Sequence, residues 1–297
     1  MVKKFVYGTP FETEAVVKEI PSSEGNPDYG TFSTENGFSF TTKLADDDMV
    51  FGLGEANRGI NKRGFLYISD CADDPNHVES KTSLYAAHNF IIISGKTHVG
   101  FFFDYPGTLR FDIGYTTSDT MTVSCENADL YVYMITGDSD LDIVKQFRGI
   151  IGRSYIAPKF AFGYGQSRWG YKTEDDFRTV VKKYRENHVP LDMVYMDIDY
   201  MQDYKDFTVN EERFPDFEGF VQDMKKEKIH LVPIIDAGVK VEKDYDIYEE
   251  GCEKGYFCRR EDGSYFEATV WPGWTHFPDV LNADARKWFG DKYDVLV

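Results

Sequence analysis

Three aspartates at the ends of two apolar segments are the residues best placed to do chemistry in this sequence. Asp197 and Asp199 close the apolar run Leu191–Ile198, and Asp236 follows the next run, Ile229–Ile235. Because alternate side chains of a strand share a face, we expect Asp197 and Asp199 to project together. Carboxylates at neighbouring strand ends can grip hydroxyl groups, bind a cation or act as acid and base. The equally open alternative is that they cap helices or bind loop amides.

Tryptophans near these aspartates add a second kind of chemistry. Trp169 lies in a polar turn at 167–171, and Trp271 and Trp274 lie in a proline-containing aromatic segment at 270–279. Indole rings that line a cleft can stack against a sugar ring, although a self-packed loop explains them as well. His276 in the same segment is by itself weak evidence for catalysis.

A strand–helix–strand pattern over residues 160–200 positions these side chains. Ala161–Gln166 is a short apolar run, Thr173 is a candidate helix N-cap, and Pro190 closes the helical segment before Leu191–Ile198. A second helix is predicted over Asp216–Glu227, and a last one begins near residue 282 or 283. We count three strand-plus-helix units, whereas a (β/α)8 barrel needs eight. We therefore expect the sequence to be part of a longer chain. The alternative, which we favour much less, is that a second polypeptide completes the sheet.

The residues before this pattern predict a separate all-β domain. Short alternating runs are separated by Gly, Asp, Asn and Pro, as in a β-sandwich. The predicted strands are Phe38–Lys43, Phe90–Ser94, Val99–Asp104 and Leu130–Met134, with Thr31–Ser33 and Thr120–Cys125 as weaker candidates. We place the domains at 1–137 and 138–297, with a helix capped by Ser139 or Asp140 opening the second and an aromatic insertion at 239–279.

The amino-acid composition excludes several classes of binding partner. The net charge of −18 argues against nucleic acid and anionic membranes, and fits a neutral or cationic small ligand. No stretch approaches the roughly 20 apolar residues of a membrane span. Four cysteines without paired spacing indicate a reducing, cytoplasmic location, and neither they nor the six histidines form a metal set. We expect no cofactor, and a homo-oligomer stays open.

Five segments together resemble glycoside hydrolase family 31, the α-glucosidase type. In chain order they read FGLGEANRGINKRG, FGYGQSRWGY, LDMVYMDIDYM, VPIIDAGV and VWPGWTHFPDVLNADARKWF, and they extend from about residue 51 to 289. The resemblance implies a galactose-mutarotase-like β-sandwich followed by the first part of a (β/α)8 barrel. It also implies retaining hydrolysis of terminal non-reducing α-glucosidic bonds, in which two carboxylates about 5–5.5 Å apart act as nucleophile and as acid/base.

The resemblance also implies roles for single residues. Asp197, with Ile198 beside it, holds hydroxyl groups of the sugar in the −1 subsite, and Asp236 and Trp271 belong to the same pocket. Trp169 helps to bound the sugar sites. Asp73, in the acidic loop at 70–75, matches a sandwich residue that reaches toward the +1 side; from the residues alone, a solvated acidic turn is the better interpretation.

The two catalytic carboxylates match nothing in this sequence. In the family the nucleophile lies on the fourth barrel strand and the acid/base further downstream, so we expect both beyond residue 297 and assign no catalytic residue here. The first hypothesis is an α-glucosidase whose sugar-binding subsites are supplied by these residues. A carbohydrate-binding protein that lacks the chemistry and a structural role for the sandwich are the alternatives.

Overall fold

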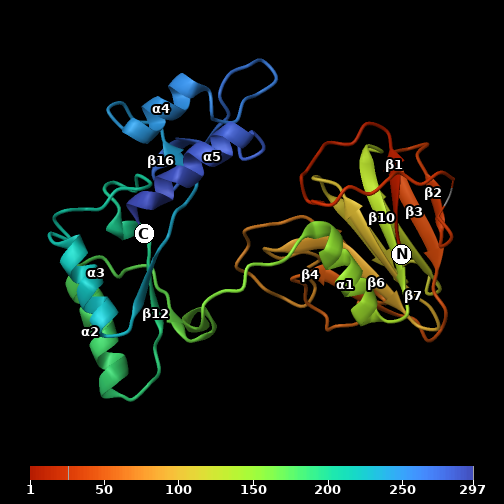
Figure 1. Ribbon diagram of the computed structural model, residues 1–297, viewed down its shortest axis with the longest axis horizontal. Helices are drawn as coiled ribbons and strands as arrows, with labels where there is room; N and C mark the ends of the chain where they lie inside the picture. The colour runs from red at the N-terminus through yellow and green to blue at the C-terminus, as the bar shows by residue number, and fades with distance from the viewer. Residues whose placement is uncertain (26, 297) are drawn as a thin grey trace. The chain divides into compact units, whose positions relative to one another are not determined.

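The computed structural model describes residues 1–25 and 27–296, which form two compact units (Figure 1). The first unit is Met1–Ser154 and the second is Tyr155–Val297. Their cores consist of different sets of side chains.

The first unit is a β-sandwich of two antiparallel sheets. One sheet has the order β1-β10-β7-β6-β4 and the other the order β2-β3-β9-β8-β5. The strands of the first sheet are β1 (Val2–Tyr7), β4 (Met49–Gly54), β6 (Ala87–Ser94), β7 (His98–Asp104) and β10 (Leu130–Gly137). Those of the second are β2 (Thr31–Ser33), β3 (Phe38–Lys43), β5 (Phe65–Ser69), β8 (Leu109–Ile113) and β9 (Thr120–Cys125).

Phenylalanine rings fill the space between the two sheets. Phe40 and Phe111 of the second sheet and Phe101 and Phe103 of the first are each 0% exposed. The ring centroids of Phe40 and Phe101 lie 4.7 Å apart. These residues alternate with outward-facing ones along each strand, so the high aromatic content of this unit is largely a packed core.

The sequence predicted six of these strands and missed four. The predictions for β2, β3, β6, β7, β9 and β10 are confirmed, with three residues added to each of β6 and β10 and one to β7. The missed β4 contains Gly52, whose φ of +123° brings its backbone close to β6; a Cβ there would lie 2.2 Å from the carbonyl oxygen of Phe90. The missed β1 and β8 carry charged residues that break the alternation, and Asp112 of β8 is buried because it accepts hydrogen bonds from the amides of Tyr115 and Thr116.

Helix α1 (Asp140–Ile151) belongs to the sandwich unit. Ser139 caps it as predicted, and its Phe147 ring stacks on Phe90 of β6 with the centroids 3.8 Å apart. We predicted a boundary near residue 137, with this helix opening the second domain. The compact units instead divide after Ser154, because the apolar face of α1 packs on the outer face of the first sheet.

The second unit begins with the predicted strand–helix repeats. Its parallel sheet has the order β11-β12-β13, and α2 and α3 lie side by side against it (Figure 1). The elements are β11 (Gly165–Gln166), α2 (Glu174–Glu186), β12 (Met193–Met196), α3 (Phe217–Lys226) and β13 (His230–Pro233). The fold prediction of three successive β/α units is thereby confirmed up to the third strand. The strands are shorter than predicted: Lys159–Phe162 is a 3₁₀ turn instead of strand, and a second 3₁₀ turn begins at Ile198.

Local signals fixed the helix starts of this unit. Thr173 and Asp176 form a reciprocal capping box at α2, and Asp216 caps α3. Phe177 of α2 and Phe220 of α3, both buried, have ring centroids 6.0 Å apart and seal the helices onto the sheet.

The segment after β13 has more structure than the predicted insertion. It contains a small antiparallel sheet of order β14-β16-β15 and a helix that we did not predict. The elements are β14 (Val239–Lys240), α4 (Asp246–Lys254), β15 (Glu267–Val270), β16 (Gly273–His276) and α5 (Ala283–Asp291), followed by a 3₁₀ turn at Lys292–Val295. Phe257 and Trp288 are at the centre of its own apolar core. Across residues 1–25 and 27–296, none of the helices is long and apolar enough to span a bilayer.

Candidate functional site

A cavity of about 280 Å³ in the second unit is the candidate site. Two indoles, two carboxylates and two isoleucines line it: Trp169, Asp197, Ile198, Ile234, Asp236 and Trp271. Five of the six sugar-site residues that the sequence predicted therefore meet around one cavity. They come from the ends of β11, β12 and β13 and from the β15–β16 hairpin.

The end of β12 supplies Asp197 and Ile198. The strand stops at Met196, and Asp197 caps the following 3₁₀ turn by accepting a hydrogen bond from the Ile198 amide at 2.8 Å. One carboxylate oxygen thus fixes the orientation of the side chain. Ile198 is only 6% exposed and forms an apolar part of the wall.

The end of β13 supplies Ile234 and Asp236. The Ile234 amide donates to the Met196 carbonyl oxygen at 2.9 Å, so the parallel pairing of β12 and β13 continues past the last strand residue. Burial raises the pKa of Asp236, and the nearby charge of Asp197 raises it further. We did not predict Ile234; it lies two residues before Asp236, and the two-residue strand period is the signal that marks it.

Trp271 lies at the tip of a tight hairpin. Val270 of β15 pairs with Gly273 of β16, so Trp271 and Pro272 form the connecting turn. Trp271 is 72% exposed although it lines the cavity, so its ring is available for contact with a ligand. Trp274, which we grouped with it as an aromatic wall, is not among the lining residues.

Trp169 is the second indole that lines the cavity, and it lies in the turn after β11. It is 65% exposed, and the ammonium of Lys172 lies 5.6 Å from the ring centroid. An exposed indole at the C-terminal end of a parallel strand is available for stacking.

Asp199 does not join Asp197, and the prediction that the two project together is wrong. Because the chain leaves the extended conformation after Asp197, the two-residue period no longer applies. Asp199 is 1% exposed, and Arg213 donates to its carboxylate at 3.3 Å. Its role is structural.

Asp206 is a buried acid that no sequence pattern singles out. It is 1% exposed, and its Oδ2 has no hydrogen-bond partner within the described residues. Burial, and secondarily the charge of Asp236, raise the pKa of Asp206 to about 8. It is therefore mainly neutral at pH 7. Nothing in the acidic loop at 200–210 distinguishes Asp206 by composition, because Tyr245, which bonds to its main chain, comes from a segment about 40 residues later.

Two further sequence candidates lie elsewhere. His276 is buried, bonds to Glu267 at 2.9 Å and packs against Phe257 and Tyr265, so it is a core histidine. Asp73 lies in the first unit, on the exposed segment between β5 and β6, and its carboxylate bonds to Tyr85. Its part in sugar binding stays a prediction.

Comparison with known proteins assigns the family. A galactose-mutarotase-like N-terminal domain of glycosyl hydrolase 31 matches residues 11–112, and the TIM-barrel domain of the same family matches residues 154–297. The chain belongs to glycoside hydrolase family 31. The predicted family and fold class are thus confirmed for a sandwich followed by part of a TIM barrel.

Characterised relatives of this family 31 chain include α-glucosidases. Alpha-glucosidase 2 of Bacillus thermoamyloliquefaciens is 36% identical over 256 residues, which are 84% of this chain and 32% of that protein. An alpha-glucosidase of Saccharolobus solfataricus is 27% identical over 97% of this chain and 42% of its own length. The chain therefore spans about a third of the curated relatives that it matches.

Solved family 31 structures share the fold. A Flavobacterium johnsoniae GH31 dextranase, complexed with isomaltotriose, has a TM-score of 0.81 at 23% identity, with 89% of this chain and 33% of that chain covered. The glucosidase II alpha subunit has a TM-score of 0.75 at 25% identity, with 85% and 30% covered.

The family 31 cavity has the chemistry of a single-ring sugar site. Its volume lies just below the roughly 300–1,000 Å³ of pockets for drug-sized ligands. Carboxylates accept hydrogen bonds from hydroxyl groups, and the indoles cover the apolar faces of a ring. In the described residues, no group of three or more His, Cys, Asp or Glu side chains is arranged to hold a metal ion.

Proposed function

We propose that this chain provides the sugar-binding subsites of a retaining α-glucosidase that removes terminal non-reducing glucose from oligosaccharides. The observation that carries the proposal is the single cavity that joins Asp197, Asp236 and Trp271. In it, Asp197 and Asp236 bind ring hydroxyls of the terminal glucose, Trp271 and Trp169 stack on it, and Ile198 excludes water.

In this proposal Asp197 and the other cavity residues bind the sugar, and other groups cleave the glycosidic bond. One oxygen of Asp197 is already committed to the Ile198 amide, which suits a fixed hydrogen-bond acceptor better than an attacking nucleophile. Binding contacts of this kind orient the substrate, and misplacing it lowers the rate even when the reacting groups are intact. Asp73 is proposed as a further sugar contact on the first unit. The four free cysteines support the proposed cytoplasmic location.

Calorimetric titration of the 297-residue chain with glucose and isomaltose tests the sugar site. We expect Trp271→Ala to weaken binding at least roughly tenfold, since the ring loses its stacking surface. Trp274→Ala is the matched control, because Trp274 is also exposed on the same hairpin but does not line the cavity. Equal affinities for these two variants would remove Trp271 from the site and with it the proposal.

Hydrolysis of p-nitrophenyl α-glucoside tests the chemistry. The protein isolated from its source cells should release p-nitrophenol, and Asp197→Ala should depress its kcat/KM severely. The 297-residue chain alone should show no turnover. Turnover by this chain that disappears with Asp197→Asn would assign cleavage to Asp197 and overturn the binding role. Glucose binding without turnover by the isolated natural protein would favour the non-catalytic alternative.

A further inference from the structure

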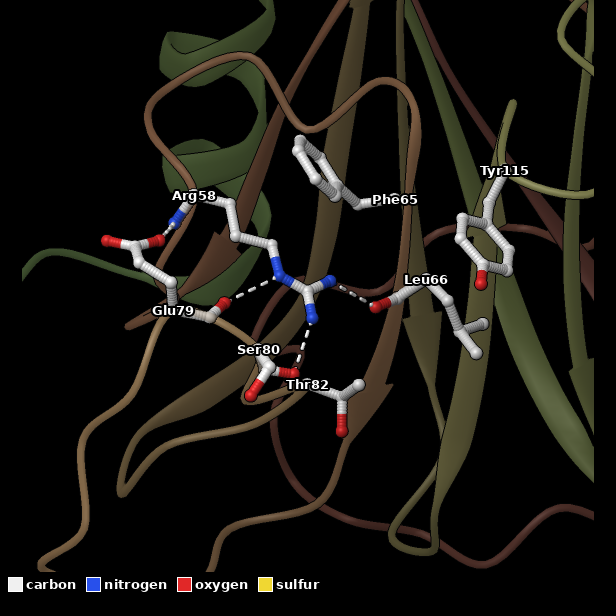
Figure 2. A pocket seen from close by; sticks show the side chains of 7 residues that line it. All are labelled: Arg58, Phe65, Leu66, Glu79, Ser80, Thr82 and Tyr115. Carbon is white, nitrogen blue, oxygen red and sulfur yellow. Dashed lines mark hydrogen bonds between the residues drawn. The ribbon is translucent and has the colours of Figure 1, made fainter.

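A second hollow, of about 530 Å³, lies wholly within the sandwich unit (Figure 2). It opens at the outer edge of the second sheet, where β5 is the last strand. Its lining combines aromatic rings, hydroxyl groups and one carboxylate. Arg58 belongs to the motif at 51–64, but the proposed function does not use the hollow.

The floor of the hollow is a covered sheet edge. Outward-facing main-chain groups of β5 would otherwise be free to pair with another strand. Instead, the Ile68 amide donates to the Thr82 carbonyl oxygen at 3.0 Å, and Nη1 of Arg58 donates to the Leu66 carbonyl oxygen at 2.9 Å. The segment 79–82 is thus held against β5 as a fixed wall.

Arg58 is occupied with this structural task. Besides Leu66, its guanidinium donates to the carbonyl oxygens of Glu79 at 2.9 Å and Ser80 at 2.5 Å (Figure 2). All three guanidinium nitrogens are therefore directed at the main chain, and the Glu79 carboxylate accepts the Arg58 amide at 3.2 Å. The Arg58 guanidinium already binds main-chain oxygens of the protein, and the Glu79 carboxylate remains in the hollow. The hollow therefore does not suit an anionic ligand.

The remaining lining groups are those that bind polyols. Phe65 is 37% and Tyr115 61% exposed, from β5 and from the turn after β8. The hydroxyls of Ser80, Thr82 and Tyr115 have no hydrogen-bond partner within residues 1–25 and 27–296. Aromatic faces with unpaired hydroxyls and a carboxylate match a ligand that has apolar ring faces and many hydroxyl groups.

We infer that the sandwich unit carries a second saccharide site, in which Tyr115 and Phe65 stack against a neutral glucan segment and Glu79, Ser80 and Thr82 bind its hydroxyls. The assignment of this saccharide as an α-glucan rests on the proposed function. An anionic ligand is disfavoured, because the lining offers a carboxylate without a free cation and the whole chain has a net charge of −18. Its role is to hold a polymer, independently of the chemistry at the Asp197 cavity.

Affinity electrophoresis of the full 297-residue chain in native gels tests the second site. One gel contains no polysaccharide, a second contains soluble dextran and a third contains soluble starch. All variants carry Trp271→Ala so that the first cavity contributes little to binding. The Trp271→Ala protein should still be retarded by at least one polysaccharide. Adding Tyr115→Ala should lower the association constant roughly 3- to 10-fold. Tyr155→Ala, at a still more exposed tyrosine outside both hollows, should change nothing.

The result that overturns the second site is equal migration of the Trp271→Ala protein with and without both polysaccharides. Equal retardation before and after adding Tyr115→Ala also overturns it. If the melting temperature shows that Tyr115→Ala does not fold, Glu79→Gln decides, since it preserves shape while removing the acceptor charge. Retardation that Trp271→Ala does not reduce at all would count against the first cavity and leave the second site standing.

Discussion

Arg213 donates to the main-chain oxygen of Asp199 at 2.7 Å, and the same nitrogen lies 3.3 Å from the Asp199 carboxylate. Asp199 is 1% exposed, and the only other cation recorded within ion-pair distance among the described residues is Lys172, at 3.9 Å. This pair draws Asp199 away from the cavity that Asp197 lines. It also makes the start of the loop after β12 depend on one arginine.

Arg213→Met should lower the free energy of unfolding of the second unit by about 3 kcal/mol, because it leaves a buried carboxylate without its main partner. Urea unfolding followed by circular dichroism measures the change. Arg260→Met, at an exposed arginine that stacks on Phe266, is the control and should cost under about 1 kcal/mol. Equal effects of the two substitutions would show that the Asp199 contact does not matter to stability.

Asp206 should make the second unit less stable as the pH rises. Its folded pKa, about 8, lies above the ordinary value of 3.8, so the folded state holds a proton that the unfolded state has lost between these pH values. The contribution of Asp206 to the free energy of unfolding is most favourable below about pH 4. It declines by up to about 1.4 kcal/mol per pH unit until about pH 8.

Asp206→Asn tests this pH dependence, since the amide is neutral throughout. Urea unfolding at pH 5, 6, 7 and 8 should show the variant gaining stability relative to the wild type with each step. Asp203→Asn, at an exposed aspartate in the same loop, should show no such trend. A constant difference between Asp206→Asn and the wild type at all four pH values would mean that Asp206 is ionised throughout.

Gly251 should resist substitution although it lies inside helix α4. A Cβ at this position would meet the Phe257 ring at 2.3 Å and the Trp288 ring at 2.9 Å. Gly251→Ala should therefore destabilise the unit by about 1–3 kcal/mol, despite the better helix propensity of alanine. Gly290→Ala in α5, where no atom lies within 4 Å of the new Cβ, should be neutral or stabilise by up to about 1 kcal/mol. Thermal unfolding of both variants measures these changes in stability. A Gly251→Ala protein as stable as the wild type would contradict the close packing at this position.

Arg58 should control the mobility of the edge that it covers. Lysine keeps the charge but cannot reach three carbonyl oxygens in a fixed plane, so Arg58→Lys should speed hydrogen exchange at the Ile68 amide roughly tenfold or more. Arg63→Lys is the matched control: Arg63 also donates to main-chain oxygens, those of Ala45, Asp48 and Ser118, but does not touch segment 79–82. Mass spectrometry of peptides that contain Ile68 makes the comparison, and unchanged exchange in Arg58→Lys would contradict the role of the guanidinium.

Much of the fold follows from short-range patterns. Thr173 caps α2 as predicted, and Asp216 and Asn282 cap the two helices that were predicted to begin at or next to them. The order of strands and helices then brings Asp197 and Asp236 to adjacent strand ends, since parallel neighbours end at the same edge. Trp271 was placed by its resemblance to a motif, because no local rule folds a hairpin tip back over a cavity.

The burial of a side chain and the direction in which it points depend on contacts between segments that are distant in the chain. Asp197 and Asp199 are two residues apart, yet a 3₁₀ turn sends one to the cavity and the other to Arg213. In the sequence Asp206 resembles other loop acids, and only the fold places it beside Tyr245 and Asp236. In the sequence Arg58 resembles a surface cation, and only the fold shows that it donates hydrogen bonds to β5 and to segment 79–82. Caps and strand periods depend on neighbours within about four residues, so the sequence determines them. Desolvation and hydrogen-bond partners depend on groups distant in the chain, so only the folded packing determines those.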